Sequence, residues 1–312
     1  MPVTEYCAEQ LLTKYATDPQ VQNLVNNVEF IFVPIMNPDG YDYTWTTNRL
    51  WRKNRRSSIT GCGSSVGVDL NRNWDFNWGI PGPATSATCS NDTYYGPAAF
   101  SEPETQVMRN YILSNTRLKV TMDFHSYSQL VMSPWGWTSA PPTPAAVAQD
   151  FQNLDNAMAA AILSVHGKVY RAGPINTTIY EASGTSVDWC YGVQGIKAFT
   201  TELRDTGQFQ FQLPTSQITP TAEENYAAFL VLVNSFAPAG APCYANCDAS
   251  TQAPVVNTAD FTCFLQQYSA GVTLATGQQQ GHYANCDAST VFPQVNTADF
   301  TCFLQKYAAG CS

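Results

Sequence analysis

The chain has 312 residues, which is enough for one large domain and a smaller one. Only 12% of the residues are charged and the net charge is -9, which argues against a nucleic-acid-binding protein, since such proteins normally have a basic face. Ten cysteines indicate an oxidising compartment, and no apolar run reaches the roughly 18 residues of a spanning helix, so we expect a secreted protein without a membrane span.

The first predicted element is a helix over residues 4–16, in which Ala8, Leu11 and Tyr15 recur at helical spacing. No signal sequence precedes this helix, although the ten cysteines call for export. Because these two observations conflict, we expect that the natural N-terminus lies upstream of Met1.

An apolar, β-rich run over residues 28–34 predicts a buried strand, and the Asn37-Pro38-Asp39-Gly40 sequence after it predicts a turn. The next segment, from about residue 41 to residue 97, is irregular and rich in Asn, Arg, Trp and Gly. Loops of this length in a compact domain are functional or disordered, and the tryptophans favour a functional loop. We expect a disulfide between Cys62 and Cys89 to hold it.

The segment from residue 101 to residue 235 alternates strands with helices, which predicts an α/β sheet. One strand ends at His125 and another ends near Glu202. A histidine at a strand end can bind zinc, act as a base or form a core hydrogen bond, and the residues alone leave these alternatives open. The predicted helices cover residues 101–114, 144–166, 186–191 and 221–235, and the predicted strands cover residues 118–125, 130–133, 169–172 and 196–203.

The composition changes to an Ala- and Pro-rich linker at residues 237–243. Beyond the linker the chain repeats itself with an offset of 39 residues, so that Asn257–Gln266 recurs from Asn296. We therefore expect a first domain over residues 1–236 and a two-repeat module over residues 244–312.

The repeats also place their cysteines at one spacing, which fits a disulfide inside each repeat. The expected pairs are Cys247 with Cys263 and Cys286 with Cys302.

Two clusters of arginine and asparagine stand out in a chain with few charges, at residues 48–56 and 69–74. The guanidinium group of arginine binds carboxylates well because it can donate two parallel hydrogen bonds to them. A functional role is favoured for Arg52 and Arg72, which are set among tryptophans. Lys53, Arg55 and Arg56 are interpreted as a solvated basic patch.

The first domain contains five motifs in a fixed order: NPDGYDYTWTTNRLWRKNR, GVDLNRNWD, DFHSYSQL, TTIYEASGTSVDW and FTTELRDTG. Together they resemble the motifs of zinc-dependent carboxypeptidases of the A/B type, and the resemblance covers about residues 5–236. It implies a three-layer α/β/α fold with a mixed sheet, followed here by the small disulfide-stapled helical module. It also implies zinc-dependent removal of C-terminal residues from peptides with free C-termini.

The resemblance implies a role for each matched residue. His125 would be a zinc ligand, Glu202 the general base and Arg52 the group that polarises the scissile carbonyl. The substrate's C-terminal carboxylate and the neighbouring subsite would be contacted by Asn71, Arg72, Tyr180 and Tyr127. The pocket for the last side chain would be lined by Ile175, Ile179, Ala182, Val187 and Thr200.

Family members that prefer basic C-terminal residues carry an acid at the position of Val187. The apolar residue here implies a preference for large aliphatic or aromatic C-terminal residues. Ordinary core packing of Val187 is the alternative interpretation, and it is compatible with the same preference.

The family's zinc site also needs a His-x-x-Glu pair before the first predicted helix, and this sequence does not contain that pair. His166 and His282 fall in a helix and in the repeat module. With His125 alone, zinc would bind weakly or not at all, because catalytic zinc takes three protein ligands. The strand leading into that motif would also be absent from the sheet, so we interpret the chain as N-terminally truncated.

The two repeats resemble dockerin modules, in which half of an EF-hand loop binds calcium before a short helix. Calcium prefers oxygen ligands at alternate loop positions. Each loop has only two carboxylates and an inserted stretch where dockerins have one glycine, so disulfide-stapled repeats without metal are the alternative. The candidate calcium ligands are Asn246, Asp248, Ser250, Asn257 and Asp260 in the first repeat and Asn285, Asp287, Ser289, Asn296 and Asp299 in the second.

Three functions follow from these patterns. The first is a secreted metallocarboxypeptidase that prefers large apolar C-terminal residues and is impaired because two zinc ligands are absent. The second is a non-catalytic binder of peptide C-termini. The third is an anchoring protein whose repeats bind a cohesin-like or cell-surface partner.

Overall fold

The structure is a computed structural model that describes residues 2–237, 247, 258–273, 286 and 295–309. The chain divides into two compact units. The first comprises Met1–Tyr15 and Val28–Phe236, and the second comprises Ala16–Asn27 and Ala237–Ser312. No helix in the described ranges is long and apolar enough to cross a membrane.

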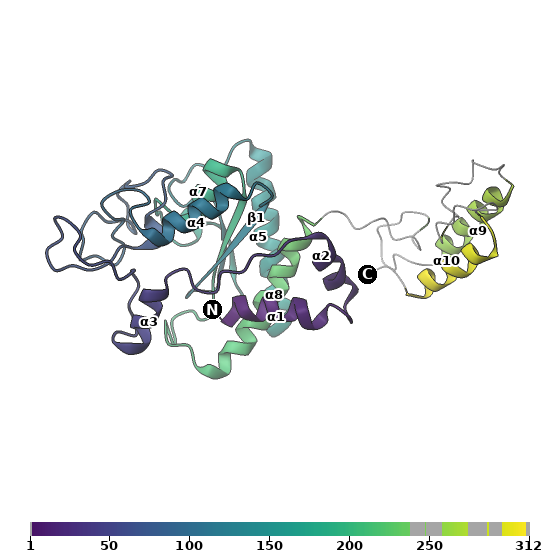
Figure 1. The fold of residues 1–312 in the computed structure, drawn as a ribbon, viewed down its shortest axis with the longest axis horizontal. Helices are drawn as coiled ribbons and strands as arrows, with labels where there is room; N and C mark the ends of the chain where they lie inside the picture. The colour runs from purple at the N-terminus through teal and green to yellow at the C-terminus, as the bar shows by residue number, and fades with distance from the viewer. Residues whose placement is uncertain (1, 238–246, 248–257, 274–285, 287–294, 310–312) are drawn as a thin grey trace. The chain divides into compact units, whose positions relative to one another are not determined.

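One mixed sheet forms the centre of the first unit, with strand order β1-β4-β2-β3 (Figure 1). β4 lies parallel to β1 and antiparallel to β2, and β3 lies parallel to β2. The strands are β1 (Val120–His125), β2 (Leu130–Ser133), β3 (Arg171–Pro174) and β4 (Lys197–Glu202). The prediction of an α/β fold with a mixed sheet is therefore confirmed.

Alternate strand residues point to opposite faces of the sheet and supply two separate cores. Val131 of β2 and Phe199 of β4 pack with side chains of α5 (Ala145–His166) and α8 (Ile218–Asn234). Their neighbours Met132 and Ala198 pack on the other face with α7 (Ser186–Gln194) and with Ile112 of α4 (Pro103–Ser114). Helices therefore cover both faces, which is the expected three-layer arrangement (Figure 1).

The sheet brings His125 and Glu202 side by side, because they are paired in the register of β1 and β4. The amide of Lys197 donates to Lys119 O at 3.2 Å, and the amide of Leu203 donates to His125 O at 2.8 Å. The odd-numbered residues of β1 therefore pair with β4. β1 is an edge strand, so its even-numbered residues face away from its only strand neighbour in the described chain.

The N-terminal region differs from the sequence-based prediction. The first helix is α1 (Pro2–Lys14), close to the expected range, and α2 (Pro19–Asn27) was not predicted. The predicted strand over residues 28–34 is wrong, because these residues have no strand partner in the described part of the chain. Their apolar side chains are used in another way: the rings of Phe30 and Phe32 lie 5.9 and 6.2 Å from the ring of Phe229 on α8.

The predicted turn at residues 37–40 is also wrong, because α3 (Pro38–Thr46) begins there. Asn37 is the N-cap of this helix, and its side-chain oxygen accepts from the amide of Gly40 at 3.0 Å. Pro38 occupies the first helical position, where its missing N–H costs nothing. Asn and Pro thus serve a helix start with the same chemistry that suits them to turns.

The segment after α3 contains little regular structure, as expected, apart from the short 3-10 helix η1 (Leu70–Arg72). The disulfide between Cys62 and Cys89 holds this segment and confirms the predicted pair. The remaining short helices of the first unit are α6 (Ile175–Thr178) and η2 (Thr215–Gln217).

The second unit contains α9 (Thr258–Val272) and α10 (Thr297–Ala309), and the disulfides Cys247–Cys263 and Cys286–Cys302 confirm the predicted pairs. Phe264 and Phe303, at equivalent repeat positions, stack with their ring centroids 3.9 Å apart. These two buried rings are the centre of a small aromatic core.

The described calcium candidates lie at helix starts. Asp260 and Asp299 are fully buried. Asp299 accepts from the amide of Asn296 at 2.7 Å, and Asn296 accepts from the amide of Ala298 at 2.8 Å, which is a reciprocal cap of α10. The other candidates, Asn246, Asp248, Ser250, Asn257, Asn285, Asp287 and Ser289, lie outside the described residues.

One buried acid in the first unit predicts a pH effect on stability. Asp155 of α5 is fully buried, and one carboxyl oxygen accepts from Ser133 at 2.6 Å while the other has no partner in the described chain. Burial raises the pKa of Asp155 well above its ordinary value. The folded protein therefore keeps a proton that the unfolded chain releases above about pH 4, so this residue lowers stability as the pH rises.

Asp155→Asn should consequently raise the melting temperature at pH 8 and change it little near pH 4. Melting curves of both proteins at the two pH values measure this difference, in which contributions from other titrating groups cancel. An offset between the two proteins that is the same at both pH values would contradict the assignment.

Candidate functional site

The site begins with the turn that carries Asn71 and Arg72. The buried carboxylate of Asp69 caps this turn, with one oxygen 3.0 Å from the amide of Asn71. Its other oxygen accepts from Nε and Nη2 of Arg52 at 2.9 and 2.7 Å. Burial alone would raise the pKa of Asp69, but the charges of Arg52 and Arg72 outweigh it and hold the pKa below its ordinary value. One ionised acid thus fixes both the turn and Arg52.

Arg72 is buried, with only 2% of its surface exposed. Its Nε donates to Ala84 O and its Nη1 donates to Asn71 O, both at 2.6 Å. Its guanidinium carbon lies 5.9 Å from the centre of the Tyr180 ring. These contacts leave Nη2 without a hydrogen-bond acceptor in the described chain, so this side of the guanidinium can bind an anion.

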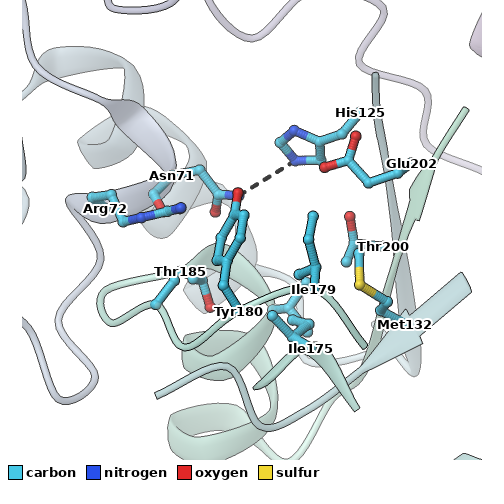
Figure 2. A pocket seen from close by; sticks show the side chains of 12 residues that line it. Asn71, Arg72, His125, Met132, Ile175, Ile179, Tyr180, Thr185, Thr200 and Glu202 are labelled. Atoms are coloured by element: carbon cyan, nitrogen blue, oxygen red, sulfur yellow. Dashed lines mark hydrogen bonds between the residues drawn. The ribbon is translucent and has the colours of Figure 1, made fainter. Parts of the chain in front are cut away.

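Asp123 and Ser186 connect His125 to the same turn. Nε2 of His125 lies 2.9 Å from Oδ2 of Asp123. The same nitrogen lies 3.4 Å from Nδ2 of Asn71 (Figure 2). Burial opposes protonation of His125, but the charge of Asp123 outweighs it and raises the pKa of His125 to about 9. The hydroxyl of Ser186 lies 3.2 Å from the same oxygen of Asp123.

Glu202 lies beside His125 at the end of β4 (Figure 2). Its Oε2 is buried without a hydrogen-bond partner in the described chain. Burial raises the pKa of this carboxyl above its ordinary value, although His125 and Arg52 act in the opposite direction. A carboxyl with a raised pKa and a free oxygen is suited to accept and return a proton.

A pocket lies between these polar groups and an apolar wall. Figure 2 shows Arg72 and Asn71 on one side, His125 and Glu202 on the other, and Tyr180, Ile179 and Ile175 between them. All the residues predicted for the last side chain line this pocket. The lining residues are Asn71, Arg72, His125, Met132, Ile175, Ile179, Tyr180, Ala182, Thr185, Val187, Thr200 and Glu202.

Two predicted site residues do not line the pocket. Arg52 is held beside it by Asp69. Tyr127 lies just beyond the end of β1, and its ring makes an edge contact with Phe211 at 4.9 Å. Arg52 is thus linked to the turn that carries Asn71 and Arg72, whereas Tyr127 follows His125 by two residues and packs on Phe211.

The prediction missed five residues that shape the site: Asp69, Asp123, Met132, Thr185 and Ser186. The position of Asp123 was available from the sequence, because residues two apart on a strand share a face and Asp123 precedes His125 by two. The position of Ser186 was not, because its partner Asn71 is 115 residues away.

The described part of the chain supplies only part of a catalytic zinc site. Such a site uses three protein ligands and one open position. The described ranges contain no group of three or more His, Cys, Asp or Glu side chains that could hold a metal ion. His125 is the one predicted zinc ligand in the described chain, and the contact of its Nε2 with Asp123 leaves Nδ1 as the nitrogen that could bind a metal. The residues that the structure describes therefore do not supply the ligand set of a catalytic zinc ion.

Comparisons with known proteins show the family of the first unit. A family profile described as zinc carboxypeptidase matches residues 2–228. Carboxypeptidase A2 of Rattus norvegicus is 45% identical over 226 residues, which are 71% of this chain and 51% of that protein. Carboxypeptidase B of Astacus astacus is 44% identical over 236 residues, which are 73% of each chain. This chain thus spans about half the length of the rat relative.

Solved structures show the same relationship. The crystal structure of carboxypeptidase A from Helicoverpa armigera has a TM-score of 0.67 and 32% identity, covering 75% of this chain and 56% of that one. Thrombin-activatable fibrinolysis inhibitor has a TM-score of 0.69 and 31% identity, covering 75% of this chain and 57% of that one. Since the family profile matches well over half of the chain, the chain belongs to the zinc carboxypeptidase family.

Proposed function

We propose that this protein binds peptides by their free C-terminus and prefers a large apolar or aromatic last residue. The observation that carries the proposal is a single pocket lined by both polar and apolar side chains. Asn71, Arg72 and Tyr180 supply hydrogen-bond donors, and isoleucine, alanine and valine side chains form its apolar wall beside Glu202. A C-terminal residue has the matching chemistry, since its carboxylate and its side chain leave one carbon atom in different directions.

The carboxylate would bind to Arg72 through the free side of the guanidinium. Asn71 and Tyr180 would each add one hydrogen bond from an amide and a phenol. Because Arg72 is already held by Ala84 O and Asn71 O, little side-chain freedom would be lost on binding.

The last side chain would enter between Ile175, Ile179 and Val187. Val187 is 3% exposed and lies at the start of α7. Among the lining residues the carboxylate is that of Glu202, and the side chains proposed to contact the last residue carry no charge. Phenylalanine, leucine and similar side chains are therefore the preferred occupants.

For hydrolysis, Glu202 would take a proton from the attacking water and pass it to the leaving amine. Arg52 would hold the negative oxygen that forms on the scissile carbonyl. The family's zinc supplies the activated water when it is bound. Because the described residues do not fit that zinc ion, we propose that this chain binds C-termini and is impaired in cleaving them.

The test uses benzoyl-Gly-Phe and its C-terminal amide as ligands. We expect calorimetry to show that the acid binds at least tenfold more tightly than the amide. A factor of about ten is what a hydrogen bond to a charged group contributes to affinity. With zinc added, hydrolysis should stay at background. Equal binding of acid and amide would refute the carboxylate site, and turnover that a chelator abolishes would refute the proposed impairment.

A second candidate function belongs to the repeat unit. We propose that it anchors a secreted protein to a cohesin-like or cell-surface partner. Leu265 and Leu304 occupy equivalent repeat positions, and each is 40% exposed, so the two helices present the same apolar side chain. The disulfides of both units support an oxidising, extracellular location.

Calcium binding by the repeats is part of this second candidate. If the loops hold calcium, millimolar calcium should raise the melting temperature of the repeat unit, because a ligand of the folded state stabilises it. Melting curves of the whole chain with calcium and with a chelator measure the effect. No shift would favour disulfide-stapled repeats in which Asp299 serves only as a helix cap.

A further inference from the structure

The amide of Asn71 is held in one orientation by the start of α7. Its Oδ1 lies 3.0 Å from the backbone nitrogen of Ser186 and 3.3 Å from the hydroxyl of Ser186. A backbone N–H can only donate, so the side-chain atom that faces it must be the oxygen. The Nδ2 group is therefore directed to the other side, where it lies 3.4 Å from Nε2 of His125 and borders the pocket.

Ser186 is itself fixed by the cap of its helix. Thr185 is the N-cap of α7, and its side chain accepts from the amide of Asp188 at 3.2 Å. Ser186 is then the first helical residue, whose N–H has no acceptor within the helix. In this protein the acceptor is the side chain of Asn71. The N–H at the start of α7 and the side chain of the Leu70–Arg72 turn are thus hydrogen-bonded to each other.

The orientation of the amide matters for an anionic ligand. With Oδ1 against Ser186, Asn71 presents a donor to the pocket. After a half-turn of the amide it would present a carbonyl oxygen, which repels a carboxylate. Rotation is opposed by the Ser186 N–H, because Nδ2 would then face another donor.

We infer that the backbone N–H of Ser186 is a positioning group for carboxylate recognition, acting through Asn71. The inference rests on the proposed function, because Asn71 needs to present a donor only if a carboxylate binds in the pocket. The hydroxyl of Ser186 is shared between Oδ1 of Asn71 at 3.3 Å and Asp123 at 3.2 Å, so the longer contact to Asn71 is the weaker one.

Two substitutions separate the N–H from the hydroxyl. Ser186→Pro removes both groups, and Ser186→Ala removes only the hydroxyl. Proline is well tolerated at the first position of a helix. The preceding residue, Thr185, has φ of -85° and ψ of 153°, which is the extended conformation that a residue before proline prefers. The backbone of α7 should therefore accept Ser186→Pro, while the ring carbon that replaces the N–H hydrogen displaces the amide of Asn71 from this contact.

The measurement is the affinity ratio between benzoyl-Gly-Phe and its amide. Ser186→Pro should lower this ratio about tenfold, the size of one hydrogen bond to a charged group, while the affinity for the amide and the melting temperature change little. Ser186→Ala should change the ratio by no more than about twofold. This pattern would support the N–H as the positioning group.

Other outcomes are also decisive. If Ser186→Pro keeps the wild-type ratio, the inference is overturned. It is equally overturned if Ser186→Pro loses acid and amide binding to the same extent with a lower melting temperature, since that result indicates a structural role. If the wild-type protein itself does not distinguish acid from amide, the proposed function fails first, and the two failures remain distinguishable.

Discussion

Replacing Glu224 with alanine is expected to lower the free energy of unfolding by about 3–5 kcal/mol, because it leaves Arg204 as an unpaired buried charge. The two side chains form a paired contact, with Nε to Oε1 at 2.8 Å and Nη2 to Oε2 at 2.5 Å. Only 5% of the Arg204 side chain and none of the Glu224 side chain is exposed. Tyr170 also donates to Glu224, at 2.7 Å, and would lose its acceptor.

The pair matters because of its position in the chain. Arg204 follows Glu202 by two residues, and Glu224 lies in α8. The contact therefore anchors the end of β4 to the helix layer. A unit of this size loses about 2–4 °C of melting temperature per kcal/mol, so Glu224→Ala should melt roughly 10 °C lower.

Glu223→Ala is the matched control for this prediction. Glu223 is the neighbouring residue on α8, and it pairs with His166 at 2.6 Å. Both partners are partly exposed, at 38% and 33%, so the pair should contribute less than about 1 kcal/mol. Calorimetric melting curves give the loss of melting temperature in each variant. Equal losses in Glu224→Ala and Glu223→Ala would show that burial does not make the Arg204–Glu224 pair more stabilising than the exposed pair.

The second large effect concerns ligand binding. Arg72→Met should weaken binding of benzoyl-Gly-Phe about 10- to 100-fold, because methionine keeps much of the length of the side chain but has no donor for a carboxylate. The C-terminal amide of the same ligand carries no charge, so its affinity should fall much less. Calorimetric titration with both ligands separates the two losses.

Arg109→Met provides the control for Arg72→Met. Arg109 lies on α4 over the ring of Phe100 and does not line the pocket. Its replacement should leave both affinities unchanged. If Arg72→Met reduced acid and amide binding equally, Arg72 would be a structural residue of the loop and not the carboxylate-binding group.

The elements with strong local signals were predictable from the sequence. The strand over residues 130–133 was predicted at its observed bounds, because four apolar or small residues lie between clear breaks. The start of α7 was also predicted, at a Thr-Ser pair suited to a cap. In these places the local chemistry and the fold demand the same conformation.

The failures occur where the conformation depends on a distant partner. Residues 28–34 have the composition of a strand, but a strand exists only when another chain segment pairs with it, and here their rings pack on α8 instead. The same limit applies to the site. The roles of His125, Glu202 and Arg72 came from a resemblance of motifs, whereas the contact of Ser186 with Asn71 depends on how two remote loops meet.

The position of β1 at the sheet edge has a consequence for behaviour in solution. Since the odd-numbered residues of β1 bond to β4, the amides of Val120, Met122 and Phe124 have no strand neighbour in the described chain. Amide hydrogens along this one strand should therefore exchange with solvent in an alternating slow and fast pattern. The same open groups are a template for pairing between molecules, so concentrated solutions would be prone to self-association along this edge.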